Sequence, residues 1–223
     1  MCGRYTYVDP YRVAEAMRRD FGVVIESEVP RYNVAPSQLV PIIHAAASGT
    51  LVAERMRWGL VPFWDQSEKP KIAPINARSE EAFGKPMFRQ AIQRRRALFP
   101  CDGFFEWQAP PSGPKTPFHI GFQGGEPFTI AGIYESATTV RPEPTCALFT
   151  TEPNELMAPI HRRMPVILNP ESARHWLRPG PITLEEFASL CQPHTAAQMI
   201  ARRISLLVNN VRNNGPEVLA PVE

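Results

Sequence analysis

Cys2 is the residue of this sequence with the most distinctive chemistry, because only Met1 stands before it. The residue behind Met1 is small, so we expect Met1 to be removed, leaving Cys2 with a free α-amine beside its thiol. Reference pKa values of about 8 for the amine and about 8.5 for the thiol leave both groups partly nucleophilic near neutral pH. Together they can condense with an aldehyde to an imine and then close a thiazolidine ring through sulfur. A cysteine at position two more often has no catalytic role and follows the initiator methionine by chance. The residue by itself leaves that alternative open.

Glu106 is the acidic residue with the most unusual surroundings. It lies between aromatic residues in CDGFFEW at 101–107, within a segment, 98–107, that reads as a buried strand. Burial raises the pKa of a carboxyl group, which lets it donate or accept a proton near neutral pH. A glutamate on an edge strand would instead point to solvent, and the residues alone do not decide between the two.

His161 lies between Pro159 and Pro165, which predicts a rigid loop rather than a helix. Arg162 and Arg163 follow it directly, so a group that titrates near pH 6.5 would stand beside cations suited to phosphate. A lone histidine is nevertheless more often structural than catalytic.

Two tryptophans stand six residues apart around a glycine and a proline. Trp58 ends a predicted strand and reads as core packing, whereas Trp64 precedes the polar run 65–68 and reads as a surface residue. An exposed aromatic ring near arginines can stack on an unpaired nucleobase.

The composition limits the possible partners and the cellular environment. The net charge of +2 is too small for nucleic-acid binding by bulk attraction, so such a site needs local arginines; only four of the 24 basic residues are lysines. A GC-rich genome would explain the arginines equally well. The four cysteines form no C-x-x-C pair, and no apolar run or signal-peptide pattern indicates a membrane or secretion. We expect no metal, no cofactor, no membrane contact and a reducing cytoplasm.

The pattern of residues predicts one α+β domain over 1–223, with an antiparallel sheet curled toward a barrel and flanked by helices. Asp9 and Gly22 bound a helix, Asn169 caps another, and Thr183 opens a third with a capping box. Strands are expected at 40–44, 51–58, 118–122, 128–134, 146–151 and 204–208. Residues 31–36 read as an ordered loop, and the basic run 94–96 reads mainly as the solvated end of a helix.

Several long motifs together carry a family resemblance. They are MCGRY at the N-terminus, RYNVAPS at 31–37, INARSE at 75–80, CDGFFEW at 101–107, MAPIHRRMP at 157–165 and VNNVRNNG at 208–215. In this order they resemble the SRAP family of abasic-site-processing proteins, once called SOS-response-associated peptidases, and the resemblance spans nearly the whole chain.

The resemblance implies a role for particular residues. Asn76, which otherwise reads as a turn residue, would orient the Cys2 amine, Glu106 would act as the acid/base, and His161 would serve the sugar oxygen. Pro36 and Trp64 would form a wedge against the duplex beside a lesion. Contacts with the DNA backbone would fall to Arg4, Arg78, Arg162 and Arg163.

The resulting hypothesis is that Cys2 traps the ring-opened aldehyde of an abasic site in single-stranded DNA, including single-strand/duplex junctions, as a covalent link. Removal of Met1 by the protein itself and weak strand cleavage at abasic sites are possible side activities. We expect a monomer in the cytoplasm, associated with the nucleoid when bound to DNA. One rival is a cysteine peptidase with a Cys2/His161 dyad, and another is a DNA-binding module without chemistry.

Overall fold

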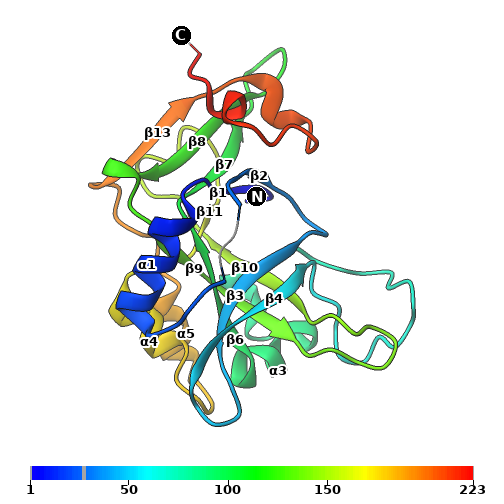
Figure 1. The fold of residues 1–223 in the computed structure, drawn as a ribbon. Helices are drawn as coiled ribbons and strands as arrows, with labels where there is room; N and C mark the ends of the chain where they lie inside the picture. Colours follow the sequence, from blue (N-terminus) through cyan, green and yellow to red (C-terminus); the bar gives the residue numbers. More distant parts are fainter. Residues whose placement is uncertain (1, 27–28, 223) are drawn as a thin grey trace.

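The computed structural model describes residues 2–26 and 29–222, and two β-sheets dominate it (Figure 1). The first sheet has five strands in the order β13-β8-β7-β1-β2, with every neighbouring pair antiparallel. Its strands are β1 (Tyr5–Tyr7), β2 (Arg31–Val34), β7 (Gly103–Gln108), β8 (Thr116–Phe122) and β13 (Met199–Arg203). The strand that follows Cys2 therefore lies between β2 and the strand that carries Glu106.

The second sheet closes on itself. It runs β11-β10-β4-β3-β6-β9-β12, and an additional pairing of β10 with β9 completes a ring of strands. Most pairs are antiparallel, but β10 runs parallel to β4 and to β5. The members are β3 (Leu39–Ala45), β4 (Leu51–Trp58), β5 (Asn76–Arg78), β6 (Arg96–Cys101), β9 (Phe128–Glu135), β10 (Thr145–Thr151), β11 (Met164–Pro165) and β12 (Ile167–Leu168). The predicted α+β class with a curled sheet is confirmed.

Helices flank this ring, and three of them begin at the caps that the sequence marks, Asp9, Asn169 and Thr183. Asp9 accepts a hydrogen bond from the amide of Arg12 at 3.0 Å, and Gly22 ends the first helix with φ 69°. Thr183 and Glu186 form the predicted capping box. The α-helices are α1 (Pro10–Phe21), α2 (Ser79–Ala82), α3 (Pro86–Arg94), α4 (Pro170–Trp176) and α5 (Leu184–Leu190). The 3₁₀ turns are η1 (Gln123–Gly125), η2 (Leu206–Asn209) and η3 (Pro216–Leu219).

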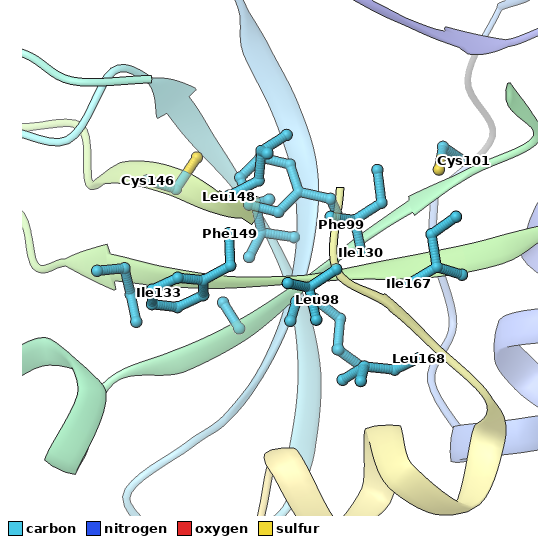
Figure 2. Packing of buried hydrophobic residues seen from close by; sticks show 14 of the residues in the cluster. Leu98, Phe99, Cys101, Ile130, Ile133, Cys146, Leu148, Phe149, Ile167 and Leu168 are labelled. Atoms are coloured by element: carbon cyan, nitrogen blue, oxygen red, sulfur yellow. The ribbon is translucent and has the colours of Figure 1, made fainter. Parts of the chain in front are cut away.

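The main core fills the inside of the ring and the space under the helices. Figure 2 shows side chains from β6, β9, β10 and β12 packed against one another, among them Leu98, Phe99 and Phe149. The Phe99 ring lies so close to Gly132 that a Cβ there would stand 2.4 Å from it, so this position requires glycine. Buried Trp176 donates its indole hydrogen to the carbonyl of Ala97 at 3.0 Å. The core therefore ties α4 to the ring.

Three sequence expectations were wrong. Residues 31–34 form strand β2 because they pair with β1, although their sequence lacks strand periodicity. The segment 98–107 is two strands in different sheets, divided at Asp102, whose carboxylate accepts hydrogen bonds from the Thr6 hydroxyl and two backbone amides. The last strand ends at Arg203, and the segment expected at 204–208 enters η2 instead.

Candidate functional site

A pocket of about 720 Å³, called the Cys2 pocket below, opens where the segment before β1 meets β7 and the loop after it, the turn after β2, the loop before β11 and the C-terminal loop. Gly3, Arg4, Pro36, Glu106 and His161 are among the residues that line it. Tertiary structure therefore brings together residues that lie as far apart in sequence as Gly3 and His161.

Cys2 immediately precedes Gly3 and Arg4, which line the pocket, and is not itself a lining residue. Its side chain is fully buried, and the thiol donates to the carbonyl of Arg4 with Sγ and O 3.7 Å apart. Burial raises the pKa of the Cys2 thiol well above its ordinary value, and the charge of Glu106 adds to this. The resting group is therefore the neutral thiol.

Asn76 holds the backbone of Cys2. It begins β5, which pairs with β10, and its Nδ2 donates to the carbonyl oxygen of Cys2 at 2.9 Å. Its other amide atom, Oδ1, is buried and accepts no hydrogen bond from the part of the chain that the structure describes. The side chain thus keeps one acceptor available beside Cys2.

Glu106 points inward from β7 with only 2% of its surface exposed. Burial raises the pKa of this carboxyl group above the ordinary value. Its Oε1 lies 3.8 Å from Nδ1 of His161, so the two titratable groups are neighbours on one side of the pocket. The sequence left open whether Glu106 is buried or faces solvent, and the structure shows that it is buried.

His161 is held by its own loop. The backbone amide of Arg163 donates to Nδ1 at 3.0 Å, and the carbonyl oxygen of the same residue lies 3.1 Å from Nδ1. Burial lowers the pKa of His161 below its ordinary value. Near neutral pH the ring is therefore uncharged, with one nitrogen able to accept a proton and the other able to donate one.

Arg4 is built into the wall of the pocket. Its Nη1 donates to Oδ1 of Asn33 and to the carbonyl of Val208, both at 2.8 Å, and its guanidinium lies 5.9 Å from the ring centre of Trp107. Much of this cation's hydrogen-bonding capacity is used inside the protein.

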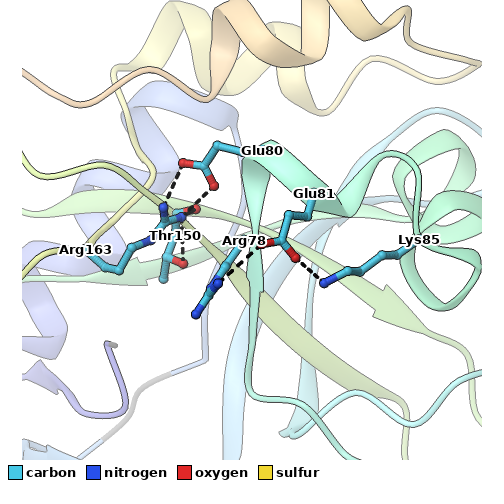
Figure 3. Close-up of polar contacts among 6 residues, drawn as sticks. All are labelled: Arg78, Glu80, Glu81, Lys85, Thr150 and Arg163. Carbon is cyan, nitrogen blue, oxygen red and sulfur yellow. Dashed lines mark hydrogen bonds and ion pairs between the residues drawn. The ribbon is translucent and has the colours of Figure 1, made fainter.

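Arg163 and Arg78 differ in their partners, as Figure 3 shows. Arg163 forms a bidentate ion pair with Glu80, with both N–O distances 2.8 Å, and also donates to the carbonyl of Thr150 at 2.5 Å. Its side chain is 13% exposed. Arg78 makes one contact of 3.3 Å with Glu81 and is 51% exposed, and Arg162 is exposed as well. Arg163 is thus engaged internally, while Arg78 and Arg162 face solvent.

The comparisons with known proteins agree with this geometry. The family model described as SOS response associated peptidase (SRAP) matches residues 1–211. The chain belongs to the SRAP family. Over 223 residues it is 39% identical to the abasic site processing protein YoqW of Bacillus subtilis, an alignment that covers 98% of this chain and 99% of that protein.

Two further proteins match this chain from end to end. The abasic site processing protein YedK of Escherichia coli is 34% identical over 231 residues, which is 100% of both chains. A crystal structure of a protein from Bacteroides thetaiotaomicron superposes with a TM-score of 0.86 at 27% identity, again over 100% of both chains. The resemblance inferred from the motifs is confirmed.

The two residues of the expected wedge lie in different hollows of this SRAP protein. Pro36 lines the pocket with Glu106 and His161. Trp64 is 49% exposed, packs edge-on against Phe63, and lines a separate hollow of about 560 Å³ beside α3. Its surface position is as predicted from the sequence.

Several residues that line or support the SRAP pocket were missed by sequence reasoning. Buried Asn33 donates through Nδ2 to the carbonyls of Val208, Asn210 and Asn213 at 2.9–3.1 Å. The asparagines of RYNVAPS and VNNVRNNG were the available signal, because such residues shape loops. Trp107, Lys115 and Asn209 also line the pocket. Trp107 was visible in its motif, but nothing near Lys115 in sequence distinguishes it.

Neither a metal cluster nor a membrane helix emerges from the described ranges. Within 2–26 and 29–222, no group of three or more His, Cys, Asp and Glu residues is arranged to hold a metal ion. None of the helices in those ranges is long and apolar enough to cross a bilayer. All four cysteines are free thiols and all are buried.

Proposed function

We propose that this protein processes abasic sites by forming a covalent link between Cys2 and the ring-opened sugar in single-stranded DNA. Its relatives in the SRAP family carry the name abasic site processing protein, which supports the substrate class. Loss of Met1 turns the Cys2 nitrogen into the primary amine that the reaction needs.

The observation that carries the proposal is the arrangement of Asn76 around Cys2. One amide atom of Asn76 fixes the Cys2 carbonyl, and the other is a buried acceptor. A newly formed amine at Cys2 would satisfy this acceptor. A buried acceptor left unbonded costs about 1–3 kcal/mol, so the amine has a prepared place. A cysteine that merely happened to stand at position two would not need such a holder.

The chemistry divides between the amine, the thiol and Glu106. The amine attacks C1′ of the aldehyde, and the carbinolamine loses its hydroxyl as water with a proton from Glu106, which regains one from nitrogen. The Cys2 sulfur then adds to the imine carbon, and its proton ends on the ring nitrogen. A carboxyl group whose pKa is raised by burial suits this exchange near neutral pH. Ring closure by sulfur also suppresses strand cleavage by β-elimination, which the imine alone would promote.

His161 acts on the sugar before the amine does. Opening of the closed sugar breaks the bond between C1′ and the ring oxygen, which must take up a proton. The neutral ring accepts the proton that the C1′ hydroxyl loses, and the imidazolium so formed gives a proton to the ring oxygen; the same exchange runs backward during reversal. Exposed Arg78 and Arg162 bind the flanking phosphates, and Pro36 and Trp64 meet the duplex at a junction.

The same site is poorly suited to a cysteine peptidase. A peptidase dyad requires a thiol whose pKa is lowered toward the thiolate. Here burial raises the pKa of Cys2, and the thiol donates to the Arg4 carbonyl. The amine route needs the thiol only after the imine has formed.

The test is a denaturing gel of the protein mixed with an abasic-site oligonucleotide. We expect a heat-stable adduct that forms without borohydride, and mass spectrometry of the active protein should show that Met1 is absent. Acetylation of the N-terminus should abolish the adduct, whereas a peptidase would survive it. An active preparation that retains Met1 would contradict the mechanism.

A further inference from the structure

A second arginine-lined pocket, of about 300 Å³, lies away from the first. The end of α3, the start of β6, the turn after β3 and the segment after α4 enclose it, and it shares no lining residue with the Cys2 pocket. Figure 1 shows α3 at the opposite end of the molecule from β7 and β13. Its lining includes Arg94, Arg96, Tyr134 and Arg178, and contains no aspartate or glutamate.

Arg96 lines this second pocket and is only 8% exposed. Among the described residues its guanidinium donates only to main-chain carbonyls, those of Ile92, Gln93, Trp176, Arg178 and Gly180. Burial lowers the pKa of this group, a sign that its charge is unfavourable there. A buried cation without a carboxylate in contact is costly, and a nearby anion would offset that cost. The expectation that the run 94–96 is simply solvated was therefore wrong for Arg96.

Only one of the three consecutive arginines is paired with an acid. Arg95 contacts buried Glu135 at 2.9 Å. The side chains of Arg94 and Arg178 are exposed, and within the described ranges neither forms a hydrogen bond or an ion pair. The pocket is therefore lined by the guanidinium groups of Arg94 and Arg178, which have no such partner in the described ranges, and by the buried guanidinium of Arg96.

The walls of the pocket are fixed before any ligand arrives. Gln93 exchanges two hydrogen bonds of 3.0 Å with the backbone of Ile182, and Arg96 holds the carbonyls of Arg178 and Gly180. These contacts anchor 176–182 against α3. A preformed site loses less entropy when it binds a ligand than a mobile loop would.

We propose that this pocket binds the phosphate group of a small phosphorylated molecule. The planar guanidinium groups of Arg94 and Arg178 can each donate two hydrogen bonds to the oxygens of a phosphate. Arg96 adds a third positive charge to the lining of the pocket. A dianion suits a pocket lined by three cations and no carboxylate. About 300 Å³ leaves room for the phosphate and part of the molecule that carries it.

The test uses the whole protein and inorganic phosphate as the probe. Thermal unfolding is followed against phosphate concentration, with chloride keeping ionic strength constant, for wild type, Arg94→Gln/Arg178→Gln and the matched control Arg89→Gln. Arg89 is an exposed arginine of the same helix that lines the Trp64 hollow and not this pocket, whereas Arg94 lines both, so the control also tests effects that come from the Trp64 hollow. Wild type and control should show a saturable rise in Tm, of about 5–10 °C at 100-fold excess over Kd.

The double variant should lose the saturable rise and keep only the small non-specific effect of phosphate. In dilute chloride it should be as stable as wild type or more stable, since repulsion among the arginines is relieved. Capture of abasic DNA should not change. Equal phosphate responses in wild type and double variant would overturn the proposal. The proposal would also be overturned if phosphate left the Tm of wild type unchanged and the double variant no longer bound an oligonucleotide without an abasic site. The pocket would then be part of a nucleic-acid-binding surface.

Discussion

The two arginine-lined pockets handle charge in opposite ways. The Cys2 pocket is lined by the cations Arg4 and Lys115 together with the acid Glu106, which lies beside His161. In the pocket beside α3, three arginines occur with no acid in the lining. One pocket therefore holds groups that can exchange protons, and the other holds fixed positive charge.

This difference separates chemistry from binding. A reaction that gains and loses protons needs groups whose pKa values lie near the working pH, and burial raises that of Glu106 while it lowers that of His161. An arginine keeps its proton at every physiological pH, so a purely arginine-lined pocket can only bind. Variants at the Cys2 pocket should accordingly change rates, and variants beside α3 should change ligand-dependent stability.

Cys2→Ala should have the largest effect, because it removes the sulfur that closes the thiazolidine ring. We expect no heat-stable adduct on a denaturing gel. Cys2→Ser should keep an amine able to form an imine, so its adduct should appear mainly after borohydride reduction. Cys191→Ala is the matched control, a buried cysteine that lines a different hollow, and it should react normally. A full yield of adduct from Cys2→Ala would remove the Cys2 pocket from the chemistry.

Glu106→Gln should slow formation of the link by roughly 10²-fold, the usual contribution of a general acid/base. The same change should stabilise the fold near neutral pH. The folded protein holds the Glu106 proton more tightly than the unfolded chain, so the free energy of unfolding falls as pH rises from glutamate's ordinary pKa through the raised one. Glutamine does not titrate, so the Glu106→Gln variant does not lose this free energy of unfolding as pH rises.

Thermal unfolding of wild type and Glu106→Gln at about pH 4 and about pH 8 measures the second effect. The variant should gain on wild type only at the higher pH. If the variant crosslinks slowly but shows no such pH-dependent gain, Glu106 is not held at a raised pKa in the free protein.

His161→Ala should slow both formation and release of the link, by no more than the ~10²-fold expected at Glu106, since its ring is partly open to water. A group that serves ring opening also serves ring closure, so rates change while the equilibrium of that step does not. A preformed adduct is chased with excess unlabelled abasic strand to follow transfer. His175→Ala, a partly exposed histidine of α4, should exchange like wild type. Wild-type exchange in His161→Ala would leave His161 a structural loop residue.

Arg78→Ala and Arg163→Ala should differ, although both were expected from the sequence to contact DNA. Arg78→Ala should leave stability within about 0.5 kcal/mol and reduce the log-log salt slope of single-strand binding by about 0.7. Arg163→Ala should cost about 1–3 kcal/mol of unfolding free energy, because Glu80 and the Thr150 carbonyl lose their partner. Denaturant unfolding and salt titration measure the two quantities. A reduced salt slope for Arg163→Ala at unchanged stability would return it to the phosphate contacts.

Short sequence motifs were enough to predict features that depend on interactions between residues close together in the chain. Asp9, Gly22 and the Thr183 capping box marked helix ends correctly because caps act within a few residues. The strands around 40–44 and 51–58 were found because turn residues separate two apolar runs. The exposure of Trp64 also followed from its immediate neighbours, whereas the neighbours of Glu106 left its burial undecided.

Long-range features could not be predicted in this way. Nothing near residues 31–34 indicates a strand, since their partner β1 is far away in sequence. Asp102 divides two strands because it binds Thr6 and two amides of another segment. Arg163 and Arg96 look like free cations in sequence, but Glu80 and a set of distant carbonyls engage them.

The sequence by itself thus determined which groups are available: an amine and thiol that can share one residue, an acid among aromatics, and an excess of arginine over lysine. The motifs also determined the family. Only the tertiary structure decided what each group can do, because pKa, hydrogen-bond partners and exposure depend on residues that the fold brings close. Asn76 reaches Cys2 through the pairing of β5 with β10, and burial in β7 sets the acidity of Glu106. The same fold gathers Arg94, Arg96 and Arg178 into a pocket without an acid.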